Sequence, residues 1–147
     1  MLTIANRVLL ILAITSAAAA QGFKPYPGAT RYTPPDNEQT RNALKDLPPG
    51  ATAASYTTPD SFEKVVAFYK GFAKQYDMPH QRAGAKLANG QELQQTFFIF
   101  DGAADITTSK SWAKVQHPFI GGVEFKGGAP QYKDVRDVTE IAVTQKK

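Results

Sequence analysis

Cysteine is absent from the 147-residue sequence, and this removes several kinds of chemistry at once. Without a thiol the chain can form no disulfide, no thiolate metal site and no cysteine-nucleophile active site. The same absence excludes a lipid anchor on cysteine, as in bacterial lipoproteins. Stability must therefore come from apolar packing, for which 9 Phe, 6 Tyr and 1 Trp supply the bulk.

Strong charge of one sign is also missing. The formal net charge is +4, and the lysines are scattered along the chain. Nucleic-acid-binding domains carry basic stripes interleaved with aromatic residues, so we expect no nucleic-acid partner. The sequence also has no G-x-S-x-G nucleophile elbow, phosphate-binding glycine loop or dinucleotide fingerprint. It therefore assigns no catalytic residue, no metal ligand and no cofactor, and it favours a non-enzymatic role.

Long apolar runs are confined to the N-terminus. Arg7 precedes an apolar segment at 8–14, and small residues follow at 15–20. This order is typical of a cleaved signal peptide, with processing expected between Ala20 and Gln21. An uncleaved membrane anchor is the alternative, but a spanning helix needs about 20 apolar residues. We therefore predict a signal peptide at 1–20 and an exported protein, periplasmic or secreted, with no transmembrane segment after cleavage.

Proline divides the remaining chain into two regions. Six of the 10 prolines fall within 21–50, and proline fixes φ and lacks an amide donor. We expect this arm to be extended and partly docked through its aromatic residues, Phe23, Tyr26 and Tyr32. A short helix within 36–45 is compatible with the pattern, opened by Asp36 or Asn37. Residues 51–147 are then expected to form a single α+β domain.

The clearest element of that domain is an amphipathic helix at about 60–76. Its start is marked either by Thr58 with Pro59 or by a capping box from Asp60 to Glu63. Apolar side chains recur at three- and four-residue spacing, which places them on one face: Phe62, Val65, Val66, Tyr69, Phe72, Ala73 and Tyr76. We expect this one principal helix to pack on an antiparallel sheet of roughly four strands.

Strands are expected at 51–57, 123–126 and 138–145, together with a hairpin at 85–100 that turns at Asn89-Gly90. A three-residue loop with Gly90 in the left-handed conformation gives a consistent register. It pairs two sets of residues, Leu87 with Gln91 and Ala85 with Leu93. It also gathers five apolar residues on the face expected to lie under the helix: Ala85, Leu87, Leu93, Phe97 and Ile99.

The opposite face of that hairpin carries Phe98 and Phe100. Either the proline-rich arm or the segment 112–119 covers these rings, or they form an exposed aromatic patch. A patch of Phe98, Phe100 and Trp112, edged by His117, would be a ligand-binding surface. It would suit a non-catalytic binding or accessory domain of the cell envelope, with an unknown small molecule or envelope protein as the partner.

Two other functions stay open. His117 with Asp101 or Asp105 as a nearby carboxylate would indicate a small periplasmic hydrolase or isomerase. A purely structural envelope protein is the other alternative. His80 is expected to be an exposed loop residue. Four aspartates could surround a calcium ion, but without the dense D-x-D-x-D-G pattern we interpret them as turn residues: Asp101, Asp105, Asp134 and Asp137.

Two segments resemble a recurrent group of small, uncharacterised exported bacterial proteins. The first is YPGA at 26–29, and the second is YTTPDSFEKVVAFYK at 56–70. In that group the YPGA segment precedes a strand, a DSxEKVVxFYK-like helix and a few further strands. The resemblance implies export and this order of elements, and it implies no activity and no functional residue.

Overall fold

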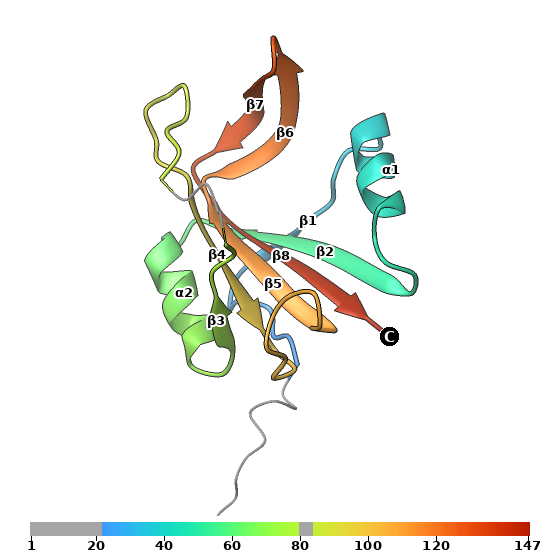
Figure 1. The fold of residues 1–147 in the computed structure, drawn as a ribbon. Helices are drawn as coiled ribbons and strands as arrows, with labels where there is room; N and C mark the ends of the chain where they lie inside the picture. The colour runs from blue at the N-terminus through green and yellow to red at the C-terminus, as the bar shows by residue number, and fades with distance from the viewer. Residues whose placement is uncertain (1–21, 80–83) are drawn as a thin grey trace, which may run out of the picture.

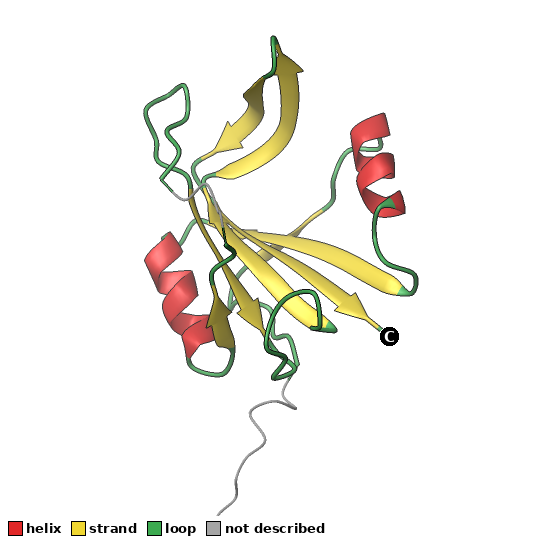
Figure 2. Ribbon diagram, in the orientation of Figure 1, coloured by secondary structure: helices red, strands yellow, loops and turns green. Residues whose placement is uncertain are grey.

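The computed structural model describes residues 22–79 and 84–147, so the predicted signal peptide and His80 lie outside the described residues. The described chain is α+β, as expected, with two helices and two sheets (Figures 1 and 2). Its elements in chain order are β1 (Thr30–Tyr32), α1 (Glu38–Lys45), β2 (Ala51–Thr58), α2 (Phe62–Lys70), β3 (Lys74–Tyr76), β4 (Gln94–Ile99), β5 (Ser111–His117), β6 (Phe119–Lys126), β7 (Ala129–Arg136) and β8 (Thr139–Lys146).

A six-stranded antiparallel sheet forms the centre of the molecule, in the order β1-β2-β8-β5-β4-β3. β6 and β7 form a separate hairpin that projects from one end of this sheet (Figure 1). The expected strands at 51–57 and 138–145 correspond to β2 and β8, which pair over their whole length. The expected total of roughly four strands and one helix was too low. Among the missed strands, β1 and β3 have only 3 residues each, too few for an alternating pattern to show, whereas β7 was missed although it has 8 residues.

Helix α2 begins close to the predicted start at about 60, but neither predicted N-cap, Thr58 nor Asp60, caps it, and the helix ends early. Ser61 is its N-cap, and the Ser61 hydroxyl accepts a hydrogen bond from the backbone amide of Lys64 at 3.2 Å. The helix ends at Lys70 with Gly71 as its C-cap, and residues 74–76 instead pair with β4. Glycine costs a helix about 1 kcal/mol relative to alanine, and the open edge of β4 gives these last residues other hydrogen-bond partners.

The hydrophobic core lies between α2 and one face of the six-stranded sheet, which we call the α2 face. From α2 the buried side chains are Val65, Val66 and Tyr69. Register partners on neighbouring strands share a face, so β4, β5 and β8 present a matching set of buried residues: Phe98, Phe100, Ala113, Val115, Ile141 and Val143.

The N-terminal segment also packs on the α2 face. The ring centroid of Phe23 lies 6.2 Å from that of Tyr69, and the Tyr69 hydroxyl donates to the carbonyl of Lys24 at 2.9 Å. The Tyr26 hydroxyl donates to Oδ2 of Asp60 at 2.6 Å. Docking of this segment through Phe23 and Tyr26 is thus confirmed. Burial raises the pKa of the Tyr69 phenol, so this phenol stays neutral in the core.

The chain between β3 and β4 turns back at Gly90, which has a φ of +84°. The Leu87 amide donates to the Gln91 carbonyl at 2.8 Å, and the Leu93 amide donates to the Ala85 carbonyl at 2.8 Å. The predicted three-residue register is therefore confirmed. The turn carries only an isolated bridge, however, because the regular partners of β4 are β3 and β5.

Helix α1 lies over the opposite face of the sheet, which we call the α1 face (Figure 1). The predicted short helix within 36–45 is confirmed, with Asn37 as the N-cap accepting from the Thr40 amide at 2.8 Å. None of the α1 residues is buried. Neither helix in the described ranges has the length and apolar character needed to cross a bilayer.

Candidate functional site

Two of the four residues predicted to bind a ligand belong to the core instead. Phe98 and Phe100 are 0% and 2% exposed, and their ring centroids lie 5.6 and 5.8 Å from that of Tyr69. Alternation along β4 correctly separates them from Phe97 and Ile99, but the prediction that the helix covers Phe97 and Ile99 was wrong. Both faces of β4 are buried, so alternation alone does not reveal which face lies under α2.

Trp112, the third predicted ligand residue, lies on the α1 face. Its ring centroid is 6.0 Å from that of Phe97, and its register partner in β8 is Thr144. The residue is half-buried. Because it is the one tryptophan of the sequence, its fluorescence reports on the α1 face.

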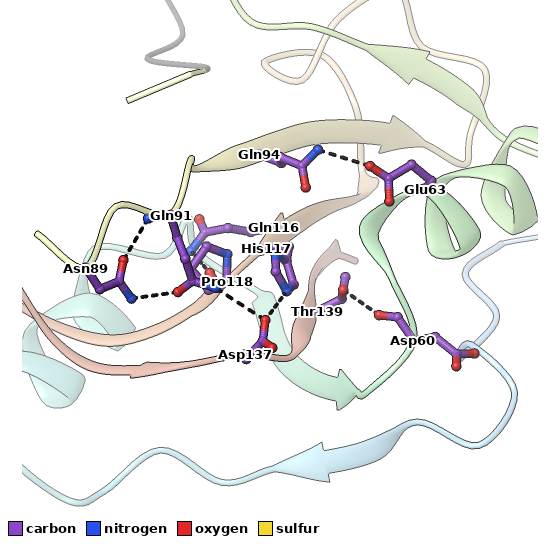
Figure 3. Close-up of polar contacts among 10 residues, drawn as sticks. All are labelled: Asp60, Glu63, Asn89, Gln91, Gln94, Gln116, His117, Pro118, Asp137 and Thr139. Carbon is purple, nitrogen blue, oxygen red and sulfur yellow. Dashed lines mark hydrogen bonds and ion pairs between the residues drawn. The ribbon is translucent and has the colours of Figure 1, made fainter. Parts of the chain in front are cut away.

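His117, the fourth predicted residue, lies at the end of β5 (Figure 3). Its Nε2 is 3.0 Å from Oδ1 of Asp137, which also accepts a hydrogen bond from Nε2 of Gln91 at 3.3 Å. The imidazole thus has a carboxylate partner, although not Asp101 or Asp105 as predicted. The Asp137 side chain is 82% exposed, so water screens this pair.

The polar side chains around His117 are already engaged (Figure 3). Nε2 of Gln94 donates to Oε1 of Glu63 at 3.1 Å, and the Thr139 hydroxyl donates to the Asp60 carbonyl at 2.7 Å. The pKa of Glu63 is lowered by a hydrogen bond from its own backbone amide and then by Gln94. These contacts tie the start of α2 to β4 and β8. Among the residues drawn, they leave a base and an orienting carboxylate but no free nucleophilic hydroxyl.

Asp101 and Asp105 stabilise the loop between β4 and β5. Asp101 accepts hydrogen bonds from the Lys110 amide at 2.6 Å and the Ser109 hydroxyl at 2.9 Å. Burial opposes ionisation of Asp101, but these hydrogen bonds outweigh it and lower the pKa of the carboxyl. The interpretation of Asp101 and Asp105 as turn residues is confirmed, whereas it was wrong for Asp134, which lies within β7. Within 22–79 and 84–147, no group of three or more histidines and carboxylates is placed to hold a metal ion.

An apolar cleft lies between α1 and the α1 face of β2 and β8. Its volume is about 430 Å³, within the range of about 300–1,000 Å³ that is typical of small-molecule sites. Thr40 and Leu44 line it from α1, and Tyr32 lines it from β1. Its floor consists of four small side chains: Ala53, Ser55, Ala142 and Thr144.

The cleft exists because the side chains of its floor are small and α1 does not pack directly against them. Ala53 pairs with Thr144 and Ser55 pairs with Ala142, so all four side chains share the α1 face. Leu44 lines the cleft and is still 56% exposed. Apolar groups in an open cleft face water, and covering them is favourable. The arrangement therefore favours an occupant that fills the space below α1.

Several polar groups around the cleft have partners within the protein. Nη1 of Arg41 lies 2.6 Å from Oδ1 of Asp36 at the exposed rim. The Ser55 hydroxyl donates to Oε1 of Glu140 at 2.8 Å. These two pairs satisfy their own polar groups, and most of the surface that lines the cleft is apolar.

This cleft was not predicted from the sequence, although two signals for it are present there. Strand β2 opens with Ala51-Thr52-Ala53-Ala54-Ser55 and has no large side chain over that stretch. The helix above it stands between two proline pairs, at 34–35 and 48–49. A short helix set off by prolines next to a strand of small residues indicates a helix that is held apart from the sheet.

Comparison with protein-family models, curated protein sequences and solved structures finds no match for this chain. Its function is therefore inferred from its own residues.

Proposed function

We propose that the protein is an exported, non-catalytic binding domain of the bacterial cell envelope, and that it holds a small apolar ligand in the cleft beneath α1. One observation carries the proposal. An amphipathic helix stands over an apolar cleft of about 430 Å³ without burying any of its own residues.

Helix α1 needs stabilisation from outside itself. Isolated helices shorter than about 12–15 residues are marginal in water, and most helices in proteins are stabilised by packing an apolar face. α1 has 8 residues and packs none of them into the core. A ligand between Leu44 and the floor would supply that packing. Each Å² of apolar surface that the ligand removes from water would contribute about 25 cal/mol of favourable free energy.

Blocking the floor of the cleft tests the proposal. N-phenyl-1-naphthylamine, a neutral probe that brightens in apolar surroundings, is expected to bind and to change the fluorescence of Trp112. Ala53→Phe places a ring in the cleft and is expected to weaken binding at least tenfold. Thr52→Phe is the matched control, because Thr52 directly precedes Ala53 in the same strand, is exposed, and points to the opposite face.

Wild-type affinity in Ala53→Phe, or an equal loss in Thr52→Phe, would place the probe elsewhere and refute the cleft as the site. If the wild-type protein takes up no probe and instead self-associates at physiological concentration, a structural envelope role replaces binding. Export is tested separately. The N-terminus of the protein recovered from periplasm or medium is expected to be Gln21.

A second candidate function is a small hydrolase or isomerase with His117 as general base. The 3.0 Å contact between His117 and Asp137 favours it, because a carboxylate orients the imidazole in many acid–base sites. A panel of model esters and peptides tests it. Turnover that disappears in His117→Gln but persists in Lys64→Met, a surface control, would establish catalysis and replace the non-catalytic proposal.

A further inference from the structure

Lys114 is positioned beside the floor of the cleft. It lies in β5, and its register partners are Ala142 in β8 and Phe97 in β4. Ala142 forms part of the cleft floor, so the Lys114 side chain leaves the sheet on the α1 face. Neighbouring strands are about 4.8 Å apart, and a lysine side chain is long enough to span that distance. Its ammonium group can therefore reach the edge of the cleft.

Lys114 is half-buried, and the structure shows no ion pair or hydrogen bond of its side chain within the described chain. Three other cations on this side of the molecule have partners: Arg31 lies over the ring of Tyr56 at 6.0 Å from its centroid, and two more are paired with carboxylates. Arg41 lies 2.6 Å from Asp36, and Arg136 makes two hydrogen bonds to Asp134 at 2.9 and 3.0 Å. A lysine ammonium within reach of an apolar cleft is complementary to an acidic group on an otherwise apolar molecule.

Glu140 does not satisfy this lysine. It shares the α1 face because its register partner Gln116 lies two residues from Lys114 in β5. However, the Glu140 carboxylate accepts from the Ser55 hydroxyl at 2.8 Å, and no ion pair with Lys114 forms within 4.0 Å. Within the described residues the Lys114 ammonium therefore has no carboxylate partner and is available to an anion.

We propose that the ligand is an amphipathic monoanion, an apolar chain or ring system bearing one carboxylate. Its apolar part would lie between Leu44 and the floor, and its carboxylate would accept a charge-assisted hydrogen bond from Nζ of Lys114. This inference rests on the proposed function, because it specifies the chemistry of the ligand in the same cleft. The small apolar cleft would favour the apolar part of the ligand, and Lys114 would favour its carboxylate.

A pair of ligands that differ only in the head group tests the inference. Decanoate and 1-decanol are titrated against the protein loaded with N-phenyl-1-naphthylamine, in low-salt buffer at pH 7.5. The wild-type protein is expected to bind decanoate about tenfold more tightly than decanol, since the free energy of a hydrogen bond to a charged group corresponds to about that ratio of affinities. Raising the ionic strength is expected to reduce the ratio of the two affinities.

Lys114→Met is expected to bring this ratio to about one while leaving the affinity for decanol unchanged. Lys114→Arg, which keeps the charge, retains the preference and shows that the site tolerates substitution. Lys64→Met removes a charge from the exposed surface of α2, on the other face of the sheet, and is expected to keep the wild-type ratio.

The outcomes separate the inference from the function on which it rests. Equal wild-type affinities for decanoate and decanol, or a preference that survives in Lys114→Met, would overturn the inference and leave the apolar cleft in place. Failure of both ligands to displace the probe, with a probe affinity unaffected by Ala53→Phe, would overturn the proposed function as well.

Discussion

Replacement of Phe98 by alanine is expected to destabilise the protein strongly. The Phe98 side chain is 0% exposed and lies against Tyr69 in the core beneath α2. Truncation of a buried phenylalanine to alanine costs about 3–5 kcal/mol, because it removes buried apolar surface and leaves a cavity. Whole domains are stable by about 5–15 kcal/mol. The variant should therefore remain folded at room temperature but lose a large share of its stability.

Urea unfolding followed by Trp112 fluorescence measures this loss. With a slope of about 2 kcal/mol per M, the midpoint should fall by about 2 M and the slope should stay the same. Phe125→Ala is the control with the same chemistry, because Phe125 is 73% exposed in the β6–β7 hairpin. It should change the free energy of unfolding by no more than about 0.5 kcal/mol. A loss below about 1 kcal/mol for Phe98→Ala would show that the ring is not in the core.

Three further changes have defined outcomes. Asp101→Asn should cost about 1–2 kcal/mol at pH 7. Because folding lowers the pKa of Asp101, this stabilisation is present above the ordinary aspartate pKa and disappears as pH falls through the lower folded value, so the wild type and variant should converge in urea titrations at strongly acidic pH. Gly121→Ala should lower the melting temperature, since the added Cβ would lie 2.5 Å from Oδ2 of Asp134. Gly122→Ala is the control and should change the melting temperature little, since its added Cβ would have its nearest neighbour at 3.5 Å. Ser61→Ala removes the N-cap of α2 and should cost about 0.5–2 kcal/mol by chemical denaturation.

Local sequence signals predicted the elements that depend on local chemistry. Helix α2 was recognised from its apolar spacing, the turn at Gly90 from its dipeptide, and a possible short helix at α1 from Asp36 or Asn37 as the N-cap. In each case the capping or turn residue acts within a few positions of itself. The end of α2 was misplaced because β3 is determined by a distant partner, the open edge of β4.

The predicted aromatic surface shows the limit of alternation. The pattern correctly placed Phe97 and Phe98 on opposite faces of one strand. It could not assign α2 to one of those faces, because both are buried and both carry large apolar residues. That assignment depends on the long-range pairing of β5 with β8, which places Val143 and Ala113 beneath the helix.

The candidate cleft was harder to predict than the fold, because it is formed by small side chains. Ala53 and Ala142 are far apart in the sequence and give no chemical signal separately. Only the pairing of β2 with β8 brings them to one face, and only the separation of α1 from the sheet makes that face accessible. Lys114 likewise had no distinguishing feature among the scattered lysines until its register partner was known.

Amide hydrogen exchange of α1, with and without ligand, tests the central claim most directly. In the free protein, the amides of residues 38–45 should exchange quickly, because this helix buries no residue. Saturation with decanoate should slow them at least tenfold and leave the amides of α2 unchanged. Saturated binding with no added protection in α1, or with protection confined to α2, would contradict a ligand site beneath α1.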